Sequence, residues 1–149
     1  MSKVPEWFYN QAGIIPYTIE DKRLRILLIK SRKGRHWIIP KGIIEPGLQP
    51  YEAAVMEALE EAGIIGDIDK AALGTYTYEK WGGVCTVKVY PLLVGTLLEK
   101  WEEDFRKRKW FKISSVKNKL EEKELFKLVG VLVDRLRLTY PSLNTNDGE

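Results

Sequence analysis

Three glutamates near the middle of the chain, Glu57, Glu60 and Glu61, are spaced to share one face of a helix. Residues three and four apart on a helix are neighbours, so these carboxylates would converge and repel one another. A bound cation would offset that repulsion, and oxygen ligands suit Mg²⁺ or Mn²⁺ better than zinc. The spacing therefore indicates a divalent-metal site, with a solvated acidic helix face as the alternative interpretation.

The segment just before this helix is rich in glycine and proline. Residues 41–49 include Gly42, Pro46 and Gly47, and we expect them to form a loop. Because glycine allows a close approach to the backbone, the loop could add a carbonyl oxygen to the same metal.

Basic residues gather in two groups, one before and one after the acidic segment. The first group is Arg32, Lys33, Arg35, His36 and Lys41, and the second is Arg106, Lys107, Arg108 and Lys109. Either group alone is typical of solvated surface charge. Guanidinium groups also match phosphate oxygens in pairs, and a long anionic substrate would need several of them.

The elements that must position these residues follow from periodicity and turn signals. Pro50 suits a helix start and Gly63 a helix end, so we expect a helix over residues 51–62, docked on a sheet through Val55, Leu59 and Ala62. We expect strands at 12–17, 24–29, 73–78 and 84–94, another short strand near Trp110 and Phe111, and an amphipathic helix over 125–136. Strands mixed with two helices indicate an α/β fold.

Composition restricts the class of protein. The 149 residues are 44% hydrophobic and 30% charged, which predicts one domain, with an ordered core over about 4–140 and a frayed tail over 142–149. The net charge of +3 says little about the class of partner. No apolar run approaches the roughly 20 residues that span a bilayer. The N-terminus lacks a signal-peptide pattern. One cysteine, Cys85, and one histidine, His36, argue against disulfides and zinc sites and favour the cytoplasm.

The acidic segment resembles the box of the Nudix hydrolases, Gly-x5-Glu-x7-Arg-Glu-U-x-Glu-Glu-x-Gly-U, where U is bulky and apolar. The matching positions are Gly42, Glu57, Ala58, Glu60, Glu61, Gly63 and Ile64. Five of these positions, Gly42, Glu57, Glu60, Glu61 and Gly63, match a fixed glycine or glutamate of the box. Five such matches arise by chance at a given start with a probability on the order of 10⁻⁵. The resemblance runs from the Ala-Gly-Ile-Ile-Pro segment through Trp37-x-x-Pro40-Lys41-Gly42 to the late Trp101-Glu102 and Arg-Lys-Arg-Lys-Trp-Phe segments. These late features and Ser31-Arg32 are similar to the branch acting on diphosphoinositol and diadenosine polyphosphates.

This resemblance implies an α/β/α sandwich with a mixed sheet, and Mg²⁺-dependent (or Mn²⁺-dependent) cleavage of a phosphoanhydride bond. It makes Glu57, Glu60 and Glu61 the catalytic metal ligands. The Lys41–Gly42 backbone would add a carbonyl ligand, and Glu103 or Glu102 a further acid. Both basic groups flank the metal site in the family's fold, which favours phosphate contacts by Arg32, Arg35, Lys41, Arg106 and Arg108.

Two positions depart from the box: Leu48 replaces its first glutamate and Met56 its arginine. The first hypothesis is a cytoplasmic pyrophosphohydrolase acting, as a monomer or homodimer, on a small polyanion such as a dinucleoside polyphosphate or a diphosphoinositol compound. A non-catalytic sensor of nucleotides or polyphosphates and an RNA 5′-pyrophosphohydrolase are the alternatives, although we expect neither nucleic acid nor membrane as a partner. Trp81, Tyr78 and Phe105 could stack on a base, but we interpret them as packing residues.

Overall fold

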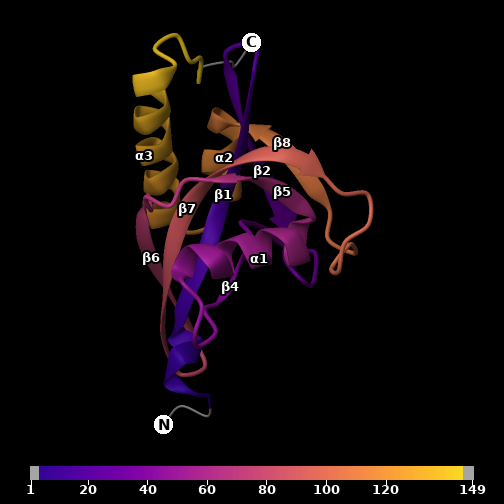
Figure 1. Ribbon diagram of the computed structural model, residues 1–149, viewed down its shortest axis with the longest axis vertical. Coiled ribbons are helices and arrows are strands. Elements are labelled where there is room, and N and C mark those ends of the chain that lie inside the picture. The colour runs from indigo at the N-terminus through magenta and orange to yellow at the C-terminus, as the bar shows by residue number, and fades with distance from the viewer. Residues whose placement is uncertain (1–3, 146–149) are drawn as a thin grey trace.

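The computed structural model describes residues 4–145 and arranges them around an eight-stranded mixed sheet (Figure 1). The strands are β1 (Asn10–Glu20), β2 (Arg23–Lys30), β3 (Trp37–Ile38), β4 (Lys41–Ile43), β5 (Ile64–Ile68), β6 (Gly74–Lys80), β7 (Gly83–Leu97) and β8 (Arg108–Lys112). The helices are the 3₁₀ helix η1 (Glu6–Tyr9) and the α-helices α1 (Pro50–Ala62), α2 (Ile113–Lys119) and α3 (Lys123–Thr139). All the predicted strands and both predicted helices are present, whereas η1, β3, β4, β5 and α2 were not predicted.

The sheet is mixed because β1 pairs in parallel with β7 and antiparallel with β2 and β4. β7 also forms antiparallel ladders with β5 and β6, and β2 forms them with β3 and β8. This arrangement brings β4 and the end of the β6–β7 hairpin to the same part of the sheet, on either side of β1.

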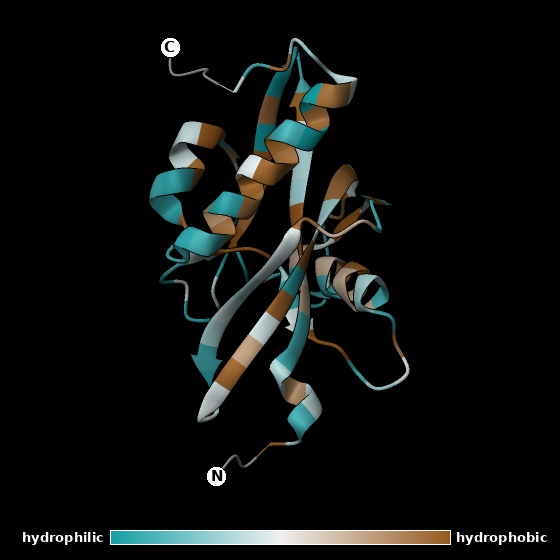
Figure 2. Cartoon of the chain, turned by 90° about the vertical axis from the view of Figure 1, so that its left-hand side faces the viewer, coloured by the Kyte–Doolittle hydropathy of each residue, from teal (hydrophilic) through white to brown (hydrophobic). Residues whose placement is uncertain are grey.

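The two faces of the sheet bury separate hydrophobic clusters. In β1 and β2, Ile14 and Leu27 pack in the cluster under α1, whereas Ile15 and Ile26 pack in the cluster under α2 and α3. This alternation follows from the two-residue period of strands. Figure 2 shows hydrophobic and hydrophilic residues on different sides of α3, and its buried residues are Leu125, Leu128, Val129, Leu132, Val133 and Leu136. The predicted α/β/α sandwich is therefore confirmed.

The helix α1 has the sequence signals for both of its ends. Gln49 and Glu52 form a capping box, Pro50 occupies the first turn, and Gly63 ends the helix in the left-handed conformation at φ 63°.

The docking face of α1 differs from the prediction. Its buried residues are Ala53, Ala54, Ala58 and Ala62, whereas Val55 is 38% exposed and Leu59 is 43% exposed. The prediction was right for Ala62 and wrong for Val55 and Leu59. Small alanine side chains allow the helix backbone to lie close to the sheet, and this close approach also directs its glutamates toward β4.

Two segments that were predicted to be irregular are ordered by long-range pairing. Residues 41–43 were expected in a loop but form β4, which pairs with residues 11–13 of β1. The tail was expected to fray from residue 142, yet Leu143 is 5% exposed and the Asn144 backbone N–H donates to the Lys22 carbonyl at 2.6 Å. The rest of that predicted tail, residues 146–149, lies outside the described residues.

None of the helices within residues 4–145 is long and apolar enough to cross a membrane.

The docking face of α1 can be tested by stability measurements. Ala58→Leu should lower the free energy of unfolding by about 1–3 kcal/mol, because the larger side chain overpacks the buried interface. Leu59→Ala should change it by no more than about 0.5 kcal/mol, because Leu59 lies on the exposed side. Urea denaturation of both variants measures the difference, and a larger loss in Leu59→Ala than in Ala58→Leu would contradict the assigned face.

Candidate active site

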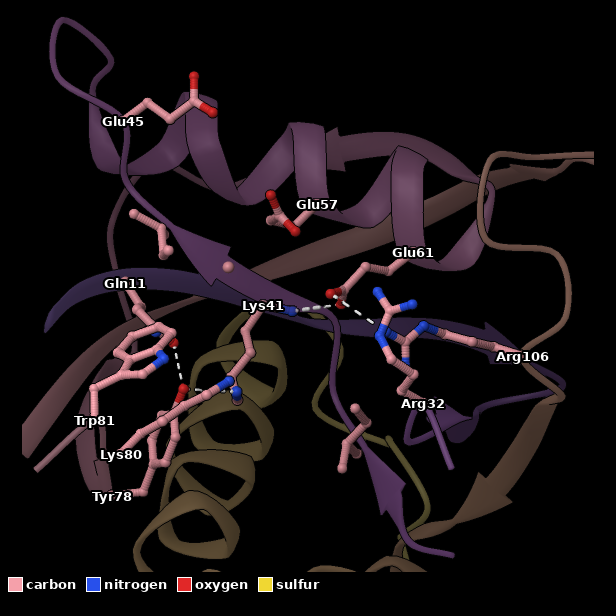
Figure 3. A pocket seen from close by; sticks show the side chains of 13 residues that line it. Gln11, Arg32, Lys41, Glu45, Glu57, Glu61, Tyr78, Lys80, Trp81 and Arg106 are labelled. Atoms are coloured by element: carbon pink, nitrogen blue, oxygen red, sulfur yellow. Dashed lines mark hydrogen bonds and ion pairs between the residues drawn. The ribbon is translucent and has the colours of Figure 1, made fainter. Parts of the chain in front are cut away.

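A cavity of about 520 Å³ opens where α1, β4 and the β6–β7 hairpin meet (Figure 3). Carboxylates from α1 lie on one wall, and basic and aromatic side chains lie around the others. The lining residues are Gln11, Arg32, Ile38, Lys41, Gly42, Ile43, Glu45, Glu57, Glu61, Tyr78, Lys80, Trp81 and Arg106. The cavity thus contains two of the three predicted catalytic glutamates.

The Glu57 carboxylate rests directly on the backbone of Gly42. A Cβ atom on Gly42 would lie 2.3 Å from Cδ of Glu57 and 2.4 and 2.6 Å from its two oxygens, so this position of the carboxylate requires glycine. Burial raises the pKa of Glu57 to about 8, and the carboxylates of Glu61, Glu60 and Glu103 also raise it. Glu57 is therefore a confined acid whose negative charge is poorly compensated.

Glu61 is tied to β4 by a backbone hydrogen bond. Its Oε1 accepts from the Lys41 N–H at 3.0 Å, and its Oε2 lies 3.8 Å from Nη2 of Arg106. Burial raises the pKa of Glu61 to about 7, although the Lys41 amide and the Arg106 charge act in the opposite direction. Because the hydrogen bond joins α1 to β4, the position of Glu61 depends on contact between these two elements.

Glu60 and Glu103 lie at the side of this cavity. The Glu103 backbone N–H donates to the Glu60 carbonyl at 3.0 Å, and burial, Glu102 and Glu103 raise the pKa of the Glu60 carboxyl. Unlike Glu57 and Glu61, the Glu60 side chain does not line the cavity.

The carboxylates of Glu57, Glu60 and Glu61 are the predicted metal ligands. Within residues 4–145, no three acidic, histidine or cysteine side chains are grouped closely enough to hold a metal ion. The three-glutamate ligand set therefore stays a prediction. The residues nevertheless fit a hard cation chemically, because the donors are all oxygen, their charges are undercompensated, and Gly42 leaves its backbone open beside Glu57.

The two arginines that line the cavity have different surroundings. The Arg106 side chain is only 5% exposed, and it donates to Glu103 Oε1 through Nε at 3.1 Å and Nη2 at 2.8 Å, and to the Lys30 carbonyl at 3.0 Å. By contrast, the Arg32 side chain is 71% exposed and reaches Glu103 at 3.4 Å. Arg106 is thus held in place by protein partners, whereas most of Arg32 faces solvent.

Two other predicted phosphate contacts, Arg35 and Arg108, are not among the residues lining the cavity. Arg35 is exposed in the loop after β2. Arg108 donates to the Ala62 carbonyl at 2.9 Å and lies 3.9 Å from the ring centroid of Trp101. The indole N–H of Trp101 donates in turn to the Glu61 carbonyl at 3.0 Å, so this pair secures the C-terminal end of α1.

The structure adds cavity residues to which sequence reasoning gave no functional role. Tyr78 donates through its hydroxyl to Oε1 of Gln11 at 2.7 Å and accepts from Nζ of Lys41 at 3.1 Å. Burial lowers the pKa of Lys41. Trp81 and Lys80 complete the same wall (Figure 3). Trp81 and Tyr78 had been interpreted as packing residues, and no local pattern could have placed Gln11 or Lys80 beside the glutamates.

The two positions that depart from the Nudix box carry no charge into the site. Leu48 packs against the cluster under α1, and Met56 is 40% exposed on α1. Neither side chain can therefore offset the negative charge around Glu57.

Comparisons with known proteins agree with this geometry. The family model described as the NUDIX domain matches residues 10–129. The human diphosphoinositol polyphosphate phosphohydrolase 3-alpha is 38% identical over 112 residues, which cover 73% of this chain and 67% of the human protein. Nudix hydrolase 18, mitochondrial, of Arabidopsis thaliana is 34% identical over 137 residues, covering 85% and 77% of the two chains. A crystal structure of the C. elegans Ap4A hydrolase shares the fold with a TM-score of 0.72 and 24% identity. The match covers 85% of this chain and 97% of the hydrolase chain.

The raised pKa values predict how stability depends on pH without metal. Since the pKa of the Glu57 carboxyl is about 8 in the folded chain and near 4.5 when unfolded, the folded state binds more protons between these values. The free energy of unfolding should therefore fall as the pH rises from 5 to 8. In EDTA, Glu57→Gln should have a higher melting temperature than wild type at pH 8.5 and nearly the same one at pH 5. An equal shift at both pH values would contradict the prediction, and Glu124→Gln, at an exposed position of α3, is the control.

Proposed function

The chain belongs to the NUDIX family and is a hydrolase of phosphorus-containing acid anhydrides, and from this premise we propose that it is a Mg²⁺-dependent pyrophosphohydrolase acting on a small polyphosphate. The observation that carries the proposal is the cavity itself. It sets Glu57 and Glu61 against the backbone of β4 and places Arg32 and Lys80 on the surrounding walls.

The metal ligands that we propose are the carboxylates of Glu57, Glu60 and Glu61, with Glu103 and a backbone carbonyl at Lys41–Gly42 as additional oxygen donors. Bound Mg²⁺, or Mn²⁺, would activate water and stabilise the phosphate that leaves. The undercompensated negative charge of the site supports this assignment, because a divalent cation would offset it.

Residues of this chain would also orient the reactants and move the proton. A carboxylate oxygen of the glutamate cluster accepts the proton of the attacking water. Arg106 positions Glu103 and lies close to Glu61, which keeps these acids at the cavity edge. We therefore assign Arg106 a positioning role beside the phosphate contact predicted from the sequence.

The cations that remain accessible would bind the phosphates that do not react. Arg32, Lys41 and Lys80 line the cavity, and the Arg32 side chain is 71% exposed. Holding the remote phosphates aligns the reacting anhydride and lowers the entropic part of the barrier. A dinucleoside polyphosphate or a diphosphoinositol polyphosphate offers the required density of negative charge, and these are the substrate classes named for the relatives.

A cytoplasmic location completes the proposal. Cys85 is the only cysteine and is buried and unpaired, as expected in a reducing compartment.

A sensor that binds polyphosphate without cleaving it is the second candidate, because Leu48 and Met56 remove an acid and a base of the family box. A substrate panel separates the two functions. It contains dinucleoside polyphosphates, diphosphoinositol polyphosphates and 5′-triphosphate RNA, each assayed with Mg²⁺ and with EDTA while the released phosphates are counted. Mg²⁺-dependent turnover supports the enzyme, and tight binding without any released phosphate supports the sensor.

The carboxylates of α1 are the first target for mutation. Glu57→Gln and Glu61→Gln should each lower kcat/KM by about 100-fold or more, because each removes a negative charge at the proposed metal site while preserving side-chain size. The melting temperature of wild type at pH 8 should rise when Mg²⁺ is added, and this rise should shrink in both variants. Glu124→Gln should behave like wild type in both measurements. Full activity in Glu61→Gln would exclude that carboxylate from the site.

The exposed arginine is the second target. Arg32→Ala should raise KM by roughly 10-fold for substrates with long phosphate chains and by less for short ones, because it removes a charged phosphate contact. Arg35→Ala is the matched control, since Arg35 lies in the same loop but outside the cavity. The Arg32 effect should weaken as salt rises. Equal KM changes in the two variants would mean that Arg32 is only a surface cation.

A further inference from the structure

Trp81 occupies an unusual backbone position beside the cavity. Lys80 pairs with Gly83 across the β6–β7 hairpin, so Trp81 and Gly82 alone form its turn. Their φ angles are 55° and 72°. Two-residue turns with positive φ at both positions favour Asn-Gly, because bulky side chains are strained in this conformation. The chain therefore holds a tryptophan at a position where the backbone of asparagine would be less strained.

The N-terminal segment fixes this tryptophan in place. The Tyr9 hydroxyl donates to the Trp81 carbonyl at 2.7 Å, and a Cβ on Gly83 would lie 2.7 Å from the Tyr9 ring. The ring centroids of Phe8 and Tyr9 lie 5.3 and 6.1 Å from that of Trp81, at interplanar angles of 62° and 78°. Both neighbours meet the indole edge-to-face rather than stacking in parallel with it. Strain that is maintained by such dedicated contacts is characteristic of ligand-binding positions.

The indole belongs to the wall of the cavity that holds the glutamates. Trp81 is half-buried and lines this cavity together with Glu57, Glu61 and Arg32 (Figure 3). Nζ of Lys80 lies 4.6 Å from the centroid of the indole. An aromatic surface is therefore accompanied by a cation, and more cations lie deeper in the cavity.

This combination matches the two parts of a nucleotide. We propose that Trp81 is the stacking platform for a nucleobase and that the substrates are nucleoside or dinucleoside polyphosphates rather than diphosphoinositol compounds. The base stacks on the indole while Lys80, Lys41 and Arg32 hold the phosphates toward Glu57. A cyclohexane ring has no π face, so an inositol cannot form the π stack that a nucleobase forms with the indole. The inference rests on the proposed function, since it names the substrate class of the same cavity.

Trp81→Asn is the decisive variant, because Asn-Gly suits the turn while the aromatic surface is removed together with its edge contacts to Phe8 and Tyr9. Its melting temperature should stay close to that of wild type, because the relieved backbone strain offsets the lost ring contacts. Its KM for diadenosine tetraphosphate, and the Kd measured by calorimetry in EDTA, should rise roughly 5- to 150-fold, the range that corresponds to losing one base–aromatic stack. Trp81→Phe should retain most of the affinity. Tyr140→Asn is the control, because Tyr140 is an exposed aromatic residue outside the cavity.

Inorganic tripolyphosphate is the probe without a base. Its inhibition constant should change less than two-fold in Trp81→Asn, because its contacts are with cations. An equal loss of tripolyphosphate and diadenosine tetraphosphate binding, or wild-type affinity for both, would overturn the stacking role. Wild-type preference for a diphosphoinositol pentakisphosphate over diadenosine tetraphosphate would overturn the substrate class. If wild type binds diadenosine tetraphosphate through Trp81 but cleaves no member of the panel, the stacking platform is supported and the proposed pyrophosphohydrolase activity is overturned.

Discussion

The close approach of α1 to β4 is the contact on which the whole site depends. At this contact the Glu57 carboxylate lies on the bare backbone of Gly42, and the Glu61 carboxylate accepts a hydrogen bond from Lys41. Only a helix with a small buried face can come this near, and the alanines of α1 provide one. The contact confines two acids in a partly desolvated space, where burial raises the pKa of each. The cost of that confinement is the physical reason why a divalent cation would bind there.

A set of neutralising and anchoring contacts maintains this geometry from the side. Arg106 is buried between Glu103 and the Lys30 carbonyl, so its charge is fixed close to Glu61. Arg108 and Trp101 hold the C-terminal end of α1 through backbone carbonyls. These residues stabilise the arrangement of the acids, whereas the exposed Arg32 remains available to a ligand. The basic groups thus divide between residues held by protein partners and residues that face solvent.

The departures from the Nudix box change this balance of charge locally. Met56 leaves no cation on α1 next to Glu57, and Leu48 contributes apolar packing instead of a carboxylate. Replacing both members of an acid–base pair with apolar residues avoids a stranded buried charge, which losing only one of them would create. Charge compensation in the described site then comes from Arg106 on one side and from Lys41 and the β4 backbone on the other.

Local sequence determined α1, α3 and the long strands of this protein, whereas the tertiary structure decided short strands such as β4 and which faces and side chains meet. The spacing of the glutamates, the Gly63 stop and the strand β1 are set by neighbours within one helix or strand, and so they could be predicted. The buried face of α1 could not, because Val55 and Leu59 are more hydrophobic than the alanines that the narrow gap over β4 selects. Arg106 and Arg108 are two residues apart, yet one contacts Glu103 and the other Ala62. Trp81 reaches the cavity only because the parallel pairing of β1 with β7 carries the hairpin there. Sheet order brings together residues that are distant along the chain, and local periodicity carries no information about that order.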